Sequence, residues 1–339
     1  MHPILKLVAQ RLALGFLLLF AASILIFVGT AILPGDVAQS ILGQAATPEA
    51  LANLRAELGV DQPAITRYFS WLGGVLQGDL GTALTNGRDI AESLSSRLGN
   101  TLFLAFWAAL IAVPLAITLG LLAVRYKDRW PDKLISAITL TTISIPEFMI
   151  GYLLIFFLSI QLPLLIGGME FLPDGLRSWL LSNLRFSSVA LMNDSMTLIE
   201  KIKSITLPIM VLTLVVLAHM MRMTRAAILN VMQSAYIETA ELKGLGMLKI
   251  IRKHAFPNAI APIVNVVMLN LAYLVVGVVV VEVVFAYPGM GQYLVDHVSK
   301  RDVPVVQACG LIFAAVYIGL NLIADIVSIL ANPRLRHPK

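Results

Sequence analysis

Six long apolar stretches, separated by polar segments, organise this sequence. An α-helix rises about 1.5 Å per residue, so about 20 apolar residues cross the roughly 30 Å hydrocarbon core of a membrane. We therefore predict six transmembrane helices, over residues 12–33, 101–124, 134–161, 206–221, 263–285 and 304–330. The first stretch continues past a possible signal-peptide cleavage site at residues 21–23, so it is expected to remain as a span.

The polar segments divide the chain into an external segment and a core. Residues 34–99 contain more acidic than basic side chains, and Thr47-Pro48 is typical of a helix start that Gly59 would end. Residues 162–205 form a second external excursion. The expected organisation is an N-terminal part with the first span (1–33), an external segment (34–99) and a core with five spans (100–339) that includes a cytoplasmic loop at 222–261.

The basic side chains indicate the orientation of these segments. Fifteen of the 25 lysines and arginines lie near the N-terminus, after the second span, between residues 222 and 253, or after the last span. Cytoplasmic loops carry an excess of Lys and Arg, so both termini are expected in the cytoplasm. With 58% hydrophobic residues and a mean hydropathy of +0.85, a soluble domain is excluded, and the net charge of +5 does not require nucleic acid.

One acidic side chain lies deep within a predicted span. Pro146 interrupts the third span near its middle, where its ring and missing amide should kink the helix or free carbonyls toward a cavity. Glu147 follows directly, and an ionised group costs at least about 2.5–3.5 kcal/mol at the membrane centre. Glu147 is therefore either a pathway-lining group that meets a cationic part of a solute or a packing residue.

Other ionisable side chains lie nearer the span ends. Glu282 and Asp325 are expected to form structural pairs, with Arg334 or Arg336 as candidate partners of Asp325. His219 falls near the cytoplasmic end of the fourth span, where a packing role is more common than proton transfer, although it is retained as a pathway candidate.

A polar loop from Tyr236 to Asn258 separates the fourth and fifth spans. Its first part has a helical pattern with Glu238 early and Lys243 late, which matches the sign of the helix macrodipole. Gly244 is expected to end this helix in the left-handed conformation. A second, basic stretch (249–254) follows, and Pro257 is expected to end it.

The same loop resembles the EAA loop of ABC-importer permeases. The match comprises Glu238-Thr239-Ala240, then Gly244 after three residues, and His254-Ala255-Phe256-Pro257 after nine more. The departures at Thr239, His254 and Phe256 resemble those of the dipeptide, oligopeptide and nickel permease branch. Segments 285–291 and 301–307 also look like family signatures, so the resemblance extends over nearly the whole chain.

This resemblance implies an all-α membrane protein with the six-helix type I permease fold. Such permeases lie in the bacterial inner (plasma) membrane and import peptides or related small solutes that a periplasmic solute-binding protein delivers. A second related permease would complete the pathway, and two ATPase subunits, rather than this chain, would bind ATP and Mg²⁺. The residues implied to dock on an ATPase subunit are Tyr236, Glu238, Thr239, Ala240, Lys243 and Gly244.

The sequence contains no motif for catalysis or metal binding. It has no G-x-x-x-x-G-K-[ST], H-E-x-x-H or G-x-S-x-G pattern, and Cys309 is its single cysteine. An intramembrane hydrolase therefore has no candidate centre. The alternative of a proton-coupled secondary transporter, using Glu147 and His219, stays open, whereas a scaffold without transport would leave Pro146 and Glu147 unexplained. The sequence identifies neither the solute nor whether the second permease is a distinct chain.

Overall fold

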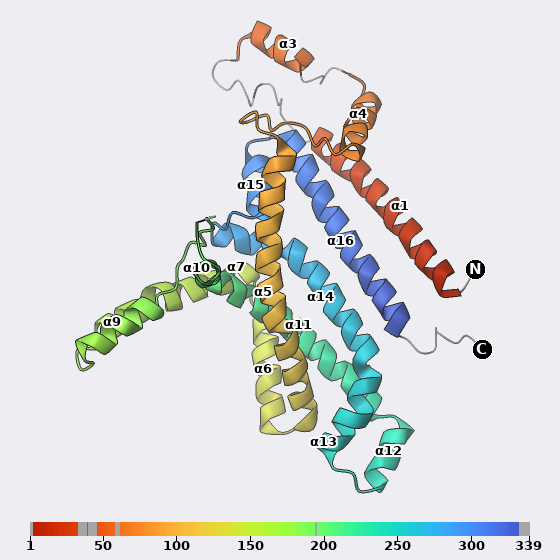
Figure 1. Ribbon diagram of the computed structural model, residues 1–339, viewed down its shortest axis with the longest axis vertical. Coiled ribbons are helices and arrows are strands. Elements are labelled where there is room, and N and C mark those ends of the chain that lie inside the picture. The colour runs from red at the N-terminus through yellow and green to blue at the C-terminus, as the bar shows by residue number, and fades with distance from the viewer. Residues whose placement is uncertain (1–2, 33–38, 40–45, 58–61, 194, 332–339) are drawn as a thin grey trace.

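Long helices form the framework of this protein (Figure 1). The computed structural model describes residues 3–32, 39, 46–57, 62–193 and 195–331. Six segments of this described part are long and apolar enough to cross a membrane, which confirms the predicted all-α, six-span fold. They are α1 (Pro3–Ile32), α5 (Ile90–Arg125), the segment Glu147–Gly167, α11 (Thr206–Met232), a segment from Met247 into α14 (Phe256–Val284), and α16 (Val303–Ala331).

Helix α11 lies at the centre of the bundle and packs against α5, α6 (Trp130–Ser144) and α14. In the apolar stretch of α11 that could cross a membrane, 61% of the residues are buried, the highest share among the six segments. The contact between α5 and α11 depends on small side chains. A Cβ added to Gly120 of α5 would lie only 2.9 Å from Thr224 Cγ2, and buried alanines continue this face of α5. Small residues of this kind let membrane helices approach closely.

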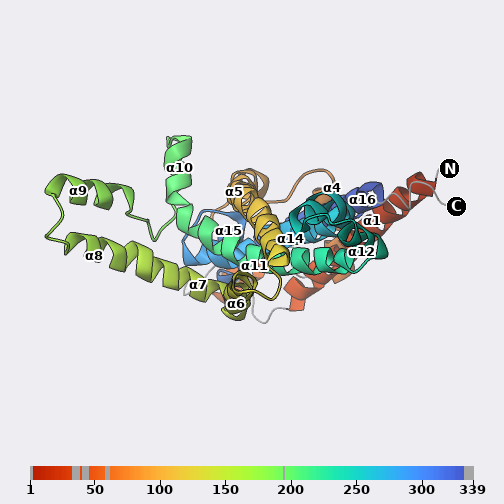
Figure 2. The same cartoon turned by 90° about the horizontal axis from the view of Figure 1, so that it is seen from below.

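The predicted third span, 134–161, is divided at Pro146, where an interruption was expected. Its predicted start is wrong, because residues 134–144 belong to the separate 15-residue helix α6 and the segment long enough to cross a membrane begins at Glu147. Helix α6 ends at Ser144, and Pro146, with φ −58° and ψ 144°, is the N-cap of α7 (Glu147–Leu154). The chain then continues through a π-helix, η2 (Ile155–Gln161), into α8 (Leu162–Gly167), so the helical segment ends six residues later than expected. Helices α7 and α8 project sideways from the bundle, with α9 (Asp174–Asn183) folded back beside them (Figures 1 and 2).

The external segment lies at one end of the bundle, here called the outer end, and the 222–261 loop lies at the opposite, inner end (Figure 1). The outer end carries α3 (Pro48–Glu57), α4 (Ala64–Leu76) and α15 (Met290–Ser299), while α10 (Leu198–Ser204) leads into α11. The predicted start of α3 is confirmed, since Ala50 N donates to Thr47 Oγ1 at 3.2 Å. The predicted stop at Gly59 lies outside the described residues.

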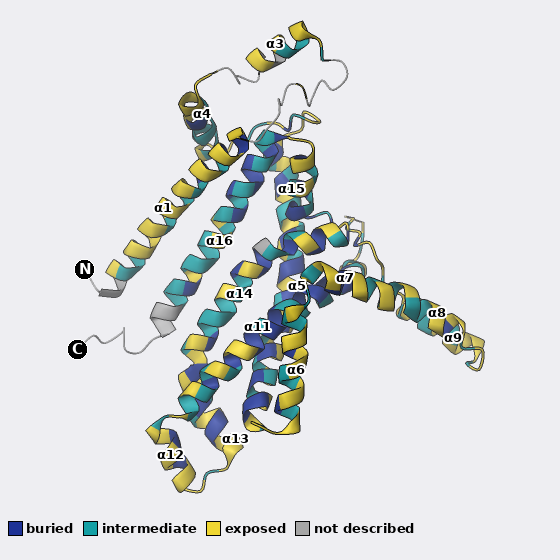
Figure 3. Ribbon diagram, turned by 180° about the vertical axis from the view of Figure 1, so that it is seen from behind, coloured by how far each residue is buried: buried dark blue, intermediate teal, exposed yellow. Residues whose placement is uncertain are grey.

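Helix α1 packs along α16 on one side of the bundle, and much of its surface is exposed (Figure 3). An ion pair joins the two helices, with Arg11 Nη1 3.0 Å from Asp325 Oδ2. The predicted structural role of Asp325 is thus met by a residue from the other end of the sequence. Arg334 and Arg336, the partners considered from the sequence, lie outside the described residues.

The prediction that Pro257 ends the basic stretch is wrong. Helix α13 (Met247–Ile250), the π-helix η3 (Ile251–Ala255) and α14 follow one another without a break, and Pro257 lies in the first turn of α14. A proline within a continuous helix removes one backbone hydrogen bond, and the wider π-turn just before Pro257 accommodates it. Asn258 Nδ2, in the first turn of α14, donates to the carbonyl of His254 in that π-turn at 2.7 Å.

A buried carboxylate joins three helices at the outer end. Glu282, near the end of α14, is 0% exposed. It accepts hydrogen bonds from Thr101 Oγ1 of α5 (2.6 Å) and from the backbone N–H groups of Gly291 (2.7 Å) and Gln292 (3.1 Å) in the first turn of α15. The predicted structural role of Glu282 is therefore fulfilled by hydrogen bonding. We call Glu282, these three donor residues and the adjacent Gly289 the outer corner.

Candidate functional site

The inner loop begins with a short helix that follows the central helix directly. Only Gln233 and Ser234 separate α11 from α12 (Ala235–Leu242). The bounds of α12 agree to within one residue with the helix predicted from Tyr236 to Lys243. One face of α12 is buried: Ile237 and Ala240 are 1% and 6% exposed. They pack in an inner cluster with Val124, Ile228, Ile250, Ile251, Ala255, Ala259 and Ile263.

Gly244 ends α12 as the sequence predicts. Its φ is +74°, the left-handed conformation that glycine adopts at little cost. The N–H of Gly244 donates to the carbonyl of Glu241 at 2.8 Å, and the N–H of Leu245 donates to that of Ala240 at 3.3 Å. This pair of hydrogen bonds is the Schellman motif, which fixes the direction in which the chain leaves the helix.

The structure separates the predicted docking residues into two groups. Tyr236, Glu238, Thr239, Lys243 and Gly244 are exposed at the inner end. Ala240 faces the inner cluster instead, so the expectation that it belongs to the contact surface is revised. Its small side chain lets α12 lie close to the helices beneath, which is the packing role that alanine serves at a helix interface.

Exposed apolar side chains accompany these polar residues and were not identified from the sequence. Leu242 is 83% exposed, and Tyr236, Met247 and Leu248 are 44–45% exposed. All four lie on α12 or α13, at the tip of the inner end (Figure 3). Exposed apolar side chains with charged neighbours are typical of protein–protein contact surfaces. The available signal in the sequence was that Leu242, at helical spacing, lies on the side of the helix away from Ile237 and Ala240.

A partly buried ion pair braces the inner half of α11. Arg225 donates from Nε to Asp132 Oδ1 at 2.9 Å and from Nη2 to Asp132 Oδ2 at 2.8 Å, a bidentate arrangement. Burial acts to raise the pKa of Asp132, but the hydrogen bonds from Arg225 and from the Asp128 N–H outweigh it and hold that pKa below its ordinary value. The pair therefore links the start of α6 to the helix that leads into α12.

A second polar group lies at the break in the third span. The hydroxyl of Tyr273 on α14 donates to the Glu147 carboxylate at the start of α7. His219 lies on α11, which packs against both α7 and α14. Of the predicted pathway candidates, Pro146 and Glu147 are adjacent at this break, and the structure adds Tyr273, which sequence reasoning missed.

This polar group is open to the surroundings of the chain. Glu147 and His219 are partly exposed, Tyr273 is 45% exposed, and the neighbouring Phe148 and Met149 are 50% and 47% exposed. A carboxylate directed at lipid would be costly, so at this depth it is expected to face protein or a water-filled space. The face that carries Glu147 is therefore expected to lie against another protein chain or a water-filled space rather than against lipid.

The histidines, acidic residues and Cys309 of the described part of the chain are not gathered at one place. Among those residues, no group of three or more His, Cys, Asp or Glu side chains is arranged to hold a metal ion. Cys309 is 0% exposed and packs with Phe313 and Val305 in an apolar cluster near the outer end.

Sequence comparisons agree with this arrangement. Residues 112–337 match the family described as binding-protein-dependent transport system inner membrane component, and residues 4–105 match the N-terminal family of these membrane components. The chain is 34% identical over 320 residues to the glutathione transport system permease protein of Escherichia coli (strain K12), covering 94% of this chain and 95% of the relative. The corresponding Salmonella typhimurium (strain LT2) protein is 33% identical over the same length.

Six spans, a helix presented at the inner end and a polar group on an uncovered membrane face define a permease. The chain belongs to the family of binding-protein-dependent transport system inner membrane components. It is a permease subunit of an ABC importer and a multi-pass protein of the inner membrane. Membership implies that ATP and Mg²⁺ act through partner ATPases and that a periplasmic binding protein supplies the solute. The proton-coupled alternative is not supported.

Proposed function

We propose that this chain forms one wall of an import pathway for small peptides or peptide-like solutes. A second, related permease would form the other wall, two ATPase subunits would bind at the inner end, and both termini would lie in the cytoplasm. The observation that carries the proposal is α12, a short helix anchored by Ile237 and Ala240 with its polar residues and Leu242 left exposed.

The path of coupling follows from how α12 is held. Its buried face packs on α11 and the α13–α14 segment, and Asp132–Arg225 braces α11 just before it. When ATP draws the ATPase subunits together, a force on α12 is transmitted to two spanning helices at once. The spans would then move between outward-open and inward-open states, as alternating access requires.

The polar group at Glu147 supports a peptide-like solute. A carboxylate next to the pathway pairs with the ammonium group of a peptide N-terminus, and Tyr273 holds that carboxylate in place. The curated relatives named above are glutathione permeases, and glutathione is a small peptide with a free amino group. These points favour a peptide with a free N-terminus over a metal complex.

The docking of α12 is tested by Gly244→Asp. We expect the variant to reach the membrane at normal levels but to lose ATP-driven uptake by at least about tenfold. The new side chain must adopt a left-handed backbone, at a cost of roughly 1–2 kcal/mol, and it adds a negative charge to the contact surface. Uptake into proteoliposomes containing the purified complex measures the effect.

Gly246→Ala is the matched control, because Gly246 is also exposed in this loop but has an ordinary φ of −66° and open space around it. Uptake near the wild-type rate is expected for it. Normal uptake by Gly244→Asp at normal protein levels would remove α12 from the coupling path. Recovery of this chain with two ATPase subunits and a second permease, from native membranes, would establish the assembly itself.

A further inference from the structure

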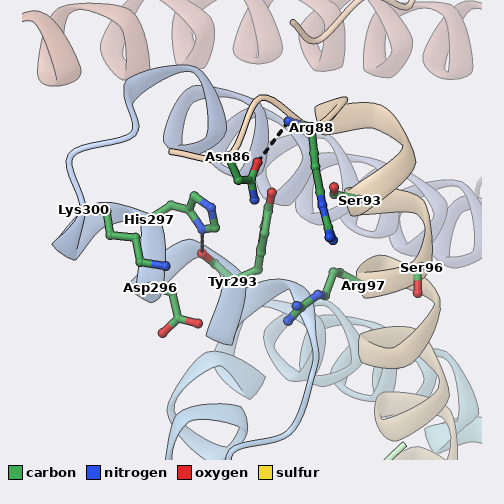
Figure 4. A pocket seen from close by; sticks show the side chains of 9 residues that line it. All are labelled: Asn86, Arg88, Ser93, Ser96, Arg97, Tyr293, Asp296, His297 and Lys300. Carbon is green, nitrogen blue, oxygen red and sulfur yellow. Dashed lines mark hydrogen bonds between the residues drawn. The ribbon is translucent and has the colours of Figure 1, made fainter. Parts of the chain in front are cut away.

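A polar cavity of about 350 Å³ lies at the outer end, away from the Glu147 group and from α12. It forms where the turn before α5 and the first turns of α5 meet α15 (Figure 4). Small-molecule pockets begin at about 300 Å³, so the space admits a side chain or a small ion with its hydration. The cavity is separate in the chain from the Glu147 group and from α12, because α15 and the turn before α5 belong to neither of them.

The cavity carries an excess of positive charge. Arg88, Arg97 and Lys300 line it, and no carboxylate of the described residues is paired with any of the three. Arg97 instead lies over the ring of Tyr293, 5.1 Å from its centroid. The one acidic side chain in the lining, Asp296, accepts a hydrogen bond from Gln292 Nε2 at 3.0 Å. The cations therefore lack an anion from the described part of this chain.

Two buried polar atoms at the cavity are also unsatisfied. His297 is 4% exposed, and its Nδ1 lies 2.9 Å from the Tyr293 carbonyl, which only accepts, so Nδ1 carries the proton. In the neutral ring Nε2 is then an acceptor, and it has no partner among the described residues. The Tyr293 side chain, in a residue 6% exposed, places its hydroxyl near Ser93 without a hydrogen bond of normal geometry.

Unpaired buried polar atoms of this kind destabilise the folded protein until a partner binds them. The side chains of Tyr293 and His297 stand side by side in the lining, between the chain segment that carries Arg88 and the end of α15 that carries Lys300 (Figure 4). A ligand that brings a carboxylate together with a hydrogen-bond donor would satisfy the cations, the Tyr293 hydroxyl and His297 Nε2 at the same time.

We propose that this cavity receives an acidic side chain of the solute-binding protein. Its carboxylate would pair with Arg88 and Lys300 and accept from the Tyr293 hydroxyl, while an adjacent N–H or hydroxyl of the same protein surface donates to His297. The position favours this occupant, because the cavity is at the end opposite α12, where a binding protein approaches. The inference rests on the proposed importer. A free carboxylate or an anionic lipid headgroup shares the charge, and the test separates them.

The test uses the assembled importer in bilayer discs of phosphatidylcholine alone, with the solute-binding protein of the same transport system as the probe. ATP hydrolysis is measured against the concentration of that protein. We expect Arg88→Gln and Lys300→Gln each to raise the half-maximal concentration roughly tenfold, with basal and maximal rates unchanged. Lys203→Gln, which removes an exposed charge on α10, is the matched control and should leave that concentration unchanged.

Three results would overturn the inference. Unchanged half-maximal concentrations in both variants, with the wild type stimulated, would show that the cavity is not the docking site. A defect that appears only when anionic lipid is added would assign the cavity to a headgroup. Competition by millimolar acetate in the wild type, without any shift in the variants, would assign it to free carboxylates. Absence of stimulation in the wild type would instead count against the proposed importer.

Discussion

Glu282 and Glu147 are the same type of residue, but one is buried and the other is partly exposed. Glu282 is fully buried and accepts three hydrogen bonds at the outer corner, from α5 and α15. Glu147 lies on a partly exposed face at the break in the third span, and Tyr273 is the hydrogen-bond donor to it. A buried acid with a full set of donors stabilises the fold, whereas one left partly open is available to a solute.

The two sites also differ in how tightly the backbone surrounds them. A Cβ on Gly289 would lie 2.1 Å from Glu282 Oε1, and one on Gly291 would lie 2.6 Å from the Cα of Val279. Around Glu147, the neighbouring Phe148 and Met149 are half exposed. Intramembrane charge therefore does not by itself identify a functional residue; the number of donors and the fit of the surrounding backbone decide.

The largest effect is expected from Gly291→Ala. Its Cβ would collide with the backbone of Val279 in α14, so α15 must move away and the Glu282 hydrogen bonds are lost. Overpacking of this kind costs roughly 1–3 kcal/mol, before the lost hydrogen bonds are counted. We expect a sharp fall in folded protein, measured by detergent size-exclusion chromatography. Gly99→Ala, in the outer part of α5, adds a Cβ that meets no neighbouring atom within 4 Å and should fold normally. Equal yields for both would contradict the tight fit.

A smaller loss of stability is expected for Glu282→Gln. The amide has an NH₂ group in place of one carboxylate oxygen, so it cannot accept from every donor among Thr101, Gly291 and Gln292. The donor left unpaired costs about 1–3 kcal/mol. The thermal unfolding midpoint of the purified protein should fall. Relative uptake rates of free and N-acetylated peptides should stay as in the wild type. A change in that ratio with an unaltered midpoint would reverse the assignment of the two glutamates.

Glu147→Gln should have the converse effect. The amide oxygen still accepts from Tyr273, so the unfolding midpoint should not change. Loss of a charge-assisted hydrogen bond to an ammonium group is worth about 1.5–3 kcal/mol, or roughly tenfold or more in affinity. Uptake of peptides with a free N-terminus should fall, while uptake of N-acetylated peptides is retained. If every substrate is taken up as before, Glu147 is a packing residue.

The smallest effect is expected for Tyr273→Phe. The ring is retained and only the hydrogen bond to Glu147 is removed, while the carboxylate that meets the solute is kept. We expect a two- to threefold rise in the KM for free peptides, with an unchanged maximal rate, because Glu147 is still charged but less well oriented. The double variant with Glu147→Gln should be no worse than Glu147→Gln alone; additive losses would show that the two residues act separately.

The spans and the inner loop could be predicted because their signals are local. Apolar length located all six spans, Pro146 marked the break in the third, and Gly244 marked the end of α12. Each depends on the chemistry of one residue or one continuous stretch.

Long-range features were missed for a physical reason. The partner of Asp325 proved to be Arg11, more than 300 residues earlier in the chain, and Tyr273 reaches Glu147 from another helix. The inward face of Ala240 depends on the helices packed beneath it. Pro257 does not end the helix as predicted, because a π-turn directly before it accommodates the proline, and the sequence does not reveal that π-turn.

That π-turn, η3, also sets the rotational phase of the inner loop. Each residue of an α-helix advances about 100° around the axis, so a turn that holds one extra residue rotates everything on its inner side by about that angle relative to α14. The adjacent residues Ile250 and Ile251 are both buried, at 1% and 2% exposed, while Arg252 and Lys253 are exposed. The π-turn thus sets which side of the α13 segment faces α12, whose buried residues pack with Ile250 and Ile251.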